Sequence, residues 1–248
     1  HKAVNPSISM NEVIQMKYMK TFAPFYLLVL GAVLVIVLWG NRAVTVMSES
    51  APVTDRHCII IDAGHGGVDG GATSCTGVLE SQINLEIALR LNDLMHLLGH
   101  STVMIRTTDT SIHTTEGSIA HIKMSDLKER VRIVNETENA LLLSIHQNNF
   151  SDGKYSGAQV FYGKTGQSEP LAKGLQSALV SSLNPGRKRQ SKKCDGIYLM
   201  EHIECTGVLI ECGFLSNVQE EAKLRTSEYQ QKLCCVIAAT VSTFLSNT

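Results

Sequence analysis

Along the 248-residue chain, short apolar runs of strand length alternate with longer stretches in which apolar residues recur at helical spacing. This alternation is the sequence feature that most constrains the fold. The expected strands are residues 58–61, 102–105, 141–145, 159–162 and 208–210. The expected helices are residues 80–98, 125–138, 168–182 and 227–245. The pattern predicts one α/β domain, in which helices flank both faces of a mostly parallel or mixed sheet.

The composition fits one globular domain with a short additional segment. Of the 248 residues, 44% are hydrophobic and 18% are charged, which supplies one core but not two large domains. The formal net charge is -1, so the chain lacks the excess of Lys and Arg with which proteins neutralise nucleic-acid phosphates. We therefore expect no nucleic-acid partner.

An uncharged apolar run of about 18 residues, 22–39, is long enough to cross most of a bilayer core as a helix. Lys17 and Lys20 precede the run and only Arg42 follows it closely, a bias that places the N-terminus in the cytoplasm. A cleaved signal segment has the same basic and apolar pattern and would release a secreted protein. Both alternatives place the rest of the chain outside the membrane.

This run sets the predicted domain organisation. A polar stretch with Ser48, Ser50 and Pro52 follows it and is typical of a linker. The predicted parts are a cytoplasmic tail at 1–21, a membrane anchor or signal segment at 22–39, a linker at 40–55 and a folded domain at 56–248. The folded domain is expected to be extracytoplasmic.

The seven cysteines are well separated except for one adjacent pair, and none has the C-x-x-C spacing of a zinc ribbon or a thioredoxin-like site. An odd number also argues against a complete disulfide framework. We expect most of them to be small buried apolar residues, with a single disulfide left open.

Polar residues stand at the carboxyl ends of three expected strands. His65 comes just past the first strand in the glycine-rich sequence D-A-G-H-G-G, His146 ends the third, and Glu211 ends the last. If these strands are neighbours, the three side chains converge at the edge where open α/β sheets place their sites. Two histidines and a carboxylate form a catalytic zinc shell with one position open for water, and another carboxylate can act on that water as general base.

Glu80 is a second candidate carboxylate. It extends backwards the apolar stripe of Ile83, Ile87 and Leu91 in the expected helix. A carboxylate on the buried side of a helix is costly unless a metal or a base compensates its charge. A Glu in a first helical turn also suits the helix dipole, and this second interpretation stays open.

These residues and their order resemble the zinc-dependent N-acetylmuramoyl-L-alanine amidases. The resemblance runs from about residue 58 to residue 245 and rests on six features in order: D-A-G-H-G-G at 62–67, Glu80, R-x-x-D at 106–109, L-x-x-R at 127–130, S-I-H-Q-N at 144–148 and E-C-G-F-L-S-N at 211–217. The resemblance implies that His65, Glu80 and His146 are the ligands of Zn²⁺ and that Glu211 is the catalytic carboxylate. It also implies a six-stranded sheet, and makes residues 56–248 a zinc amidase catalytic domain.

The resemblance implies a peptidoglycan hydrolase that cleaves the amide between the lactyl group of N-acetylmuramic acid and L-alanine. Within the family the chain is most like the short, membrane-anchored, germination-specific type, which acts on spore cortex and feeds the formation of muramic-δ-lactam. The sequence shows no wall-binding repeat, so the anchor itself or an activating or localising partner protein would position the enzyme.

Two rival functions fit parts of the same pattern. Another zinc hydrolase of cell-wall polymer, a carboxypeptidase or a deacetylase, would use the same ligands and base. A non-catalytic peptidoglycan-binding module would be expected to have lost part of the site, whereas all four candidate residues are present.

Three weaker features surround the candidate site. A basic run at 187–193 is typical of a solvated loop, or of a contact with anionic wall polymer or an acidic partner. Asp62 and Gln147 could orient the histidine ligands, and Asp62 could equally cap the turn of its loop. Cys212 adjoins Glu211, but side chains alternate along a strand, so we expect its thiol to face away from the metal.

Overall fold

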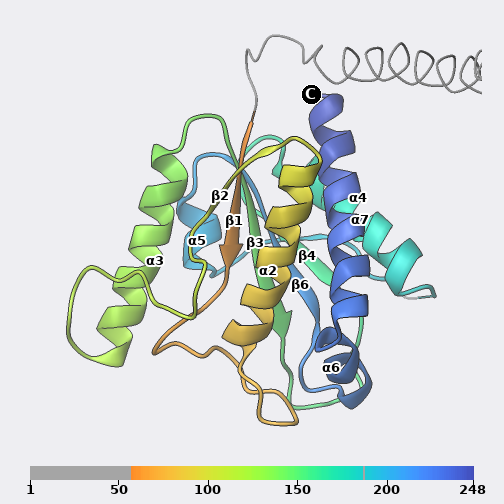
Figure 1. The fold of residues 1–248 in the computed structure, drawn as a ribbon, viewed down its shortest axis with the longest axis horizontal. Helices are drawn as coiled ribbons and strands as arrows, with labels where there is room; N and C mark the ends of the chain where they lie inside the picture. The colour runs from red at the N-terminus through yellow and green to blue at the C-terminus, as the bar shows by residue number, and fades with distance from the viewer. Residues whose placement is uncertain (1–56, 187) are drawn as a thin grey trace, which may run out of the picture. The chain divides into compact units, whose positions relative to one another are not determined.

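A six-stranded sheet organises residues 57–186 and 188–248, which are the residues that the computed structural model describes (Figure 1). The strands are β1 (Cys58–Ala63), β2 (Ser101–Met104), β3 (Ala140–Asn148), β4 (Gln159–Tyr162), β5 (Lys192–Lys193) and β6 (Thr206–Phe214). Their order is β2-β1-β3-β6-β4-β5, and each neighbouring pair is parallel except β4 with β6. The predicted α/β class with a mixed six-stranded sheet is confirmed.

Within the described residues, four long helices and two short ones flank the sheet. They are α2 (Glu80–Leu97), α3 (Ile119–Glu136), α4 (Ser168–Leu183), α5 (Tyr198–His202), α6 (Val218–Leu224) and α7 (Ser227–Ser246). The predicted start of α3 at residue 125 is wrong, because the side chain of Ser118 accepts a hydrogen bond from the backbone N–H of His121 and caps the helix earlier. The two short helices, α5 and α6, were not expected from the sequence.

Each central strand contributes to two apolar cores because its side chains alternate between the faces of the sheet. Ile59 and Ile61 of β1 lie in the larger core, which α2, α4 and α7 complete. Ile60 points the other way, into a smaller core with residues of α3 and α5. Figure 1 shows α2 and α7 side by side over one face, with α3 apart from them.

The same alternation sets the direction of the candidate catalytic residues. His146 of β3 and Glu211 of β6 are directly paired in the parallel register. Cys212, the next residue, lies in the larger core with α7 and is fully buried. Glu211 and His146 therefore share the opposite face, and the expectation that Cys212 faces away from them is confirmed.

All seven cysteines fall within the described residues, and none of them forms a disulfide. Three are buried, namely Cys194, Cys212 and Cys234. Cys58 and Cys205 are half-buried, and Cys75 and Cys235 are exposed. The expectation of mostly buried thiols is thus met only in part.

The predicted tail, anchor and linker at 1–55 lie outside the described residues. Among the residues that are described, no helix combines the length and the apolar character needed to cross a membrane. Part of the basic run, expected as a loop, forms strand β5, because Lys192 and Lys193 pair with β4.

A chain that begins at Asp55 is expected to be soluble and to fold, because residues after this point make both apolar cores. Circular dichroism and urea unfolding would measure this against the full chain. A shortened chain that unfolds without a cooperative transition would contradict the expectation.

Candidate metal and catalytic site

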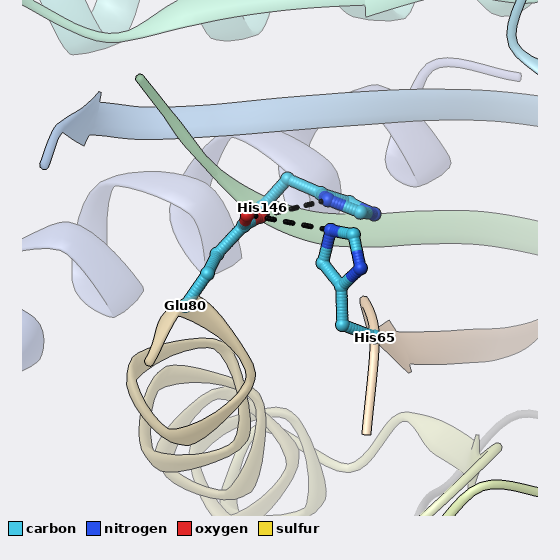
Figure 2. A group of neighbouring side chains, drawn as sticks. All are labelled: His65, Glu80 and His146. Carbon is cyan, nitrogen blue, oxygen red and sulfur yellow. Dashed lines mark hydrogen bonds and ion pairs between the residues drawn. The ribbon is translucent and has the colours of Figure 1, made fainter. Parts of the chain in front are cut away.

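Four side chains from different parts of the chain meet at the carboxyl-end edge of the sheet. His65 lies in the loop after β1, Glu80 is the first residue of α2, and His146 and Glu211 lie on the paired strands β3 and β6. Figure 2 shows His65, Glu80 and His146 pointing toward one another. Each of these three offers one possible ligand atom, and these atoms all lie within 4.8 Å of one another.

Glu80 is only 4% exposed, and its carboxylate contacts both histidines. Its Oε2 is 3.3 Å from His65 Nε2, and its Oε1 is 3.1 Å from His146 Nδ1. The backbone N–H groups of Ala72 and Gln147 donate to the same two oxygens. Burial raises the pKa of Glu80, but the hydrogen bonds and charges of His146 and His65 outweigh it and hold the pKa well below its usual range. The carboxylate is thus a fixed anion of the site and does more than match the helix dipole.

Asp69 orients the His65 ring. Asp69 Oδ2 lies 2.9 Å from His65 Nδ1, and Lys123 Nζ of α3 lies 2.7 Å from the other oxygen of Asp69. Burial lowers the pKa of His65, but the hydrogen bonds and charges of Asp69 and Glu80 raise it to about 9. Because Nδ1 is held by Asp69, Nε2 faces Glu80, as in sites where an outer carboxylate fixes the orientation of a metal-binding histidine.

Glu211 is a buried carboxyl group of a different kind. Its Oε2 has no hydrogen-bond partner among the described residues. Burial raises the pKa of Glu211 to about 7; the positive charge of His146 opposes this rise and the negative charge of Glu80 adds to it. A carboxyl group that titrates near neutral pH can both accept and return a proton, although a cation bound nearby would lower this pKa.

Two buried arginines clamp the loop that carries His65, which accounts for two of the sequence motifs. Arg106 donates hydrogen bonds to the carbonyls of Ala63 and Gly64, and Arg130 of α3 donates to those of Ala63 and His65. His65 has φ of +63°, in the left-handed region that few residues other than glycine occupy. The clamp holds the loop in this strained conformation.

The partners of Asp62 differ from those that the sequence suggested. Its carboxylate pairs with Arg130 and accepts a hydrogen bond of 2.7 Å from Ser144 Oγ. Asp62 thus anchors the clamp, and it neither orients a ligand nor caps the turn. Gln147 does support the site, since its backbone binds Glu80 and its amide donates to Asn84 Oδ1.

Three residues of the site were not expected from the sequence: Asp69, Lys123 and Asn84. Asn84 stands one helical turn after Glu80 on its buried side, and its Nδ2 lies 3.3 Å from Glu80 Oε1. A polar residue within the apolar stripe was a usable signal for Asn84. The contact of Asp69 with His65 depends on the path of the glycine-rich loop, for which the sequence carries no periodic signal.

Two glycines leave the space in which these side chains meet. A Cβ atom at Gly64 would lie 2.2 Å from His146 Nε2. A Cβ atom at Gly71, where φ is +67°, would lie 2.7 Å from both Glu80 Oε2 and His65 Cδ2. Two imidazoles and one carboxylate at this spacing are the ligand set of a catalytic zinc site, so the residues present fit that ion.

We expect Gly64→Ala to weaken zinc binding by about tenfold or more, because the added methyl group displaces the His146 ring. Gly166→Ala is the matched control, since no atom within 4 Å meets its Cβ. Calorimetric titration with zinc measures both affinities. Equal affinities would show that the spacing of the ligands does not depend on Gly64.

Arg130→Met is expected to lower the free energy of unfolding by about 3–5 kcal/mol, because it leaves Asp62 buried without its charge partner. The control is Arg132→Met on the same helix, where the pairs with Glu129 and Glu136 are exposed to water and contribute little to stability. Urea unfolding compares the two variants. A similar loss in both would contradict the role of the clamp.

Comparison with known proteins identifies the family. The model of the family described as N-acetylmuramoyl-L-alanine amidase (Amidase_3) matches residues 59–243. The germination-specific N-acetylmuramoyl-L-alanine amidase of Bacillus subtilis is 40% identical over 191 residues, which are 76% of this chain and 79% of that protein.

Solved structures also resemble the chain, among them two amidases. The CwlD amidase of Clostridioides difficile, in complex with the GerS lipoprotein, is 36% identical, with a TM-score of 0.74 over 78% of this chain and 100% of that one. An N-acetylmuramoyl-L-alanine amidase from Clostridium difficile 630 is 30% identical, with a TM-score of 0.68 over 79% of this chain and 100% of that one. The chain therefore belongs to the N-acetylmuramoyl-L-alanine amidase family.

Proposed function

We propose that the chain is a zinc-dependent peptidoglycan hydrolase that cleaves the amide between N-acetylmuramic acid and L-alanine, with His65, Glu80 and His146 as metal ligands. Membership of the amidase family supports the reaction. The observation that carries the residue roles is the buried Oε2 of Glu211, on the strand beside His146, to which none of the described residues gives a hydrogen bond.

The roles follow from the chemistry of amide hydrolysis. When bound, zinc would polarise the amide carbonyl and lower the pKa of the attacking water. Glu211 would take a proton from that water and give it to the alanine nitrogen, which is too basic to leave as an anion. Asp69 would keep Nε2 of His65 directed toward Glu80, and Arg106 and Arg130 would hold the loop in place.

We further propose that the substrate is spore-cortex peptidoglycan and that the product feeds the formation of muramic-δ-lactam. The 40% identity to the germination-specific amidase of Bacillus subtilis supports this role.

Incubation with cortex-type peptidoglycan should release free stem peptides without new reducing ends, as mass analysis would detect. A carboxypeptidase would release single amino acids, and a deacetylase would release acetate.

We also propose that the enzyme works outside the cytoplasmic membrane, held by residues 22–39 or released by their cleavage, and that a partner protein activates or localises it. The apolar run and its flanking charges support the location. The CwlD amidase, solved in complex with the GerS lipoprotein, supports a partner of that kind.

Glu211→Gln is expected to retain zinc and to lose about 10²–10⁴-fold in rate, because the amide keeps the size of the side chain but cannot take a proton. Metal content and turnover are to be measured on one preparation. Zinc retained with near wild-type turnover would exclude the catalytic role, and zinc lost together with the rate would make Glu211 a ligand.

His146→Ala is expected to lose stoichiometric zinc, because only two of the three ligands remain. Metal analysis after dialysis measures the occupancy, with His121→Ala of α3 as a control at an exposed histidine. Full zinc occupancy in His146→Ala would overturn the assignment of this ligand.

A further inference from the structure

A cluster of three aromatic rings lies on the loop after β3 and at the end of β6. Phe150 is 51% exposed and Tyr155 is 42% exposed, whereas Phe214 is fully buried. The ring centroids lie 5.4 Å apart for Phe150 and Tyr155, 5.5 Å for Phe150 and Phe214, and 6.2 Å for Tyr155 and Phe214. We call Phe150, Tyr155 and Phe214 the aromatic shelf.

The shelf adjoins the candidate site because it continues the two strands that carry His146 and Glu211. Asn148 of β3 pairs with Phe214 of β6, just beyond the pairing of His146 with Glu211. At no more than about 3.6 Å per residue, the Cα of Phe150 lies within about 14 Å of that of His146. A substrate with a few linked sugar rings covers such a span.

Polar contacts fix the backbone of the shelf. The amide of Asn217 donates to the carbonyl of Gly153 at 2.7 Å. The carboxylate of Glu220 accepts from the backbone N–H of Gly157 at 2.7 Å and from that of Phe214 at 2.9 Å. In Figure 1 the loop after β3 runs past α6, to which Glu220 belongs. Because these contacts already hold the backbone of the loop, binding has less of the loop to order.

Two cations border the shelf. The guanidinium of Arg189 lies 4.9 Å from the ring centroid of Phe214, and Lys154 Nζ lies 5.3 Å from that of Tyr155. Peptidoglycan combines the apolar C–H faces of its sugar rings with the carboxylates of its stem peptides. Lys154 already pairs with Asp152 at 2.6 Å, and Arg189 donates a hydrogen bond to the carbonyl of Ser156. The exposed rings, and not these cations, therefore offer the surface that complements the sugar faces.

We propose that the aromatic shelf is a subsite that binds a sugar ring of the glycan strand next to the muramic acid at the cleaved amide. This inference rests on the proposed function. The C–H face of a pyranose packs against an aromatic face while its hydroxyl groups stay in water. Two half-exposed rings offer far less surface than the roughly 800 Å² that each side of a stable protein interface buries, but they match the face of one sugar.

The test measures binding of peptide-free glycan strands of alternating N-acetylglucosamine and N-acetylmuramic acid to the zinc-loaded full chain by calorimetry. Phe150→Ala with Tyr155→Ala is expected to raise the Kd about tenfold, since the apolar contact area is lost. Phe150→Leu, which keeps an apolar side chain but no aromatic face, is expected to fall between this variant and wild type. Leu97→Ala is the control, because Leu97 is 83% exposed and lies at the far end of α2 from Glu80.

Unchanged affinity in the double variant, or no binding of glycan strands by the wild type, would overturn the subsite. Urea unfolding midpoints equal to that of Leu97→Ala would show that a weaker Kd does not come from misfolding. Cleavage of a muramyl peptide without flanking sugars by the wild type tests the proposed function separately, so that its failure leaves the glycan-binding result readable.

Discussion

The burial of Glu80 is the constraint on which the rest of the site depends. A carboxylate that is taken out of water is unstable unless donors or cations surround it. Here two imidazoles and two backbone N–H groups surround it, and one of each kind comes from the loop after β1 and one of each kind from the end of β3. The glycine-rich loop, the start of α2 and the end of β3 are therefore fixed relative to one another by one charge.

The helices on the two faces of the sheet contribute to the site in different ways. α2 supplies Glu80 from the face of the larger core. From the other face, α3 supplies Arg130 to the backbone of the His65 loop and Lys123 to Asp69. The sheet edge is thus held from both sides, and the loop keeps its left-handed residue because two arginines bind its carbonyls.

Features set by neighbouring residues in the sequence could be predicted, and features set by contacts between distant segments of the chain could not. Buried strands and long helices show as apolar runs and stripes, whereas α5 has only five residues and β5 exists only through its pairing with β4. The first turns of α3 are polar or exposed and gave no stripe. The convergence of His65, His146 and Glu211 followed from parallel strand ends, but the separate roles of Glu80 and Glu211 came from the family resemblance. The bond from Asp69 to His65 needed the folded loop.

The direct pairing of His146 with Glu211 limits how the family can vary in length. Side chains alternate along β6, so a shift of one residue would replace Glu211 at the site with Ile210 or Cys212, both of which belong to the larger core. An insertion or deletion within these two strands would exchange the buried carboxyl group at the site for an apolar side chain and bury the carboxyl group on the wrong face. Evolutionary changes in length should therefore collect in the connection between β3 and β6, where loops can absorb them without moving the pair.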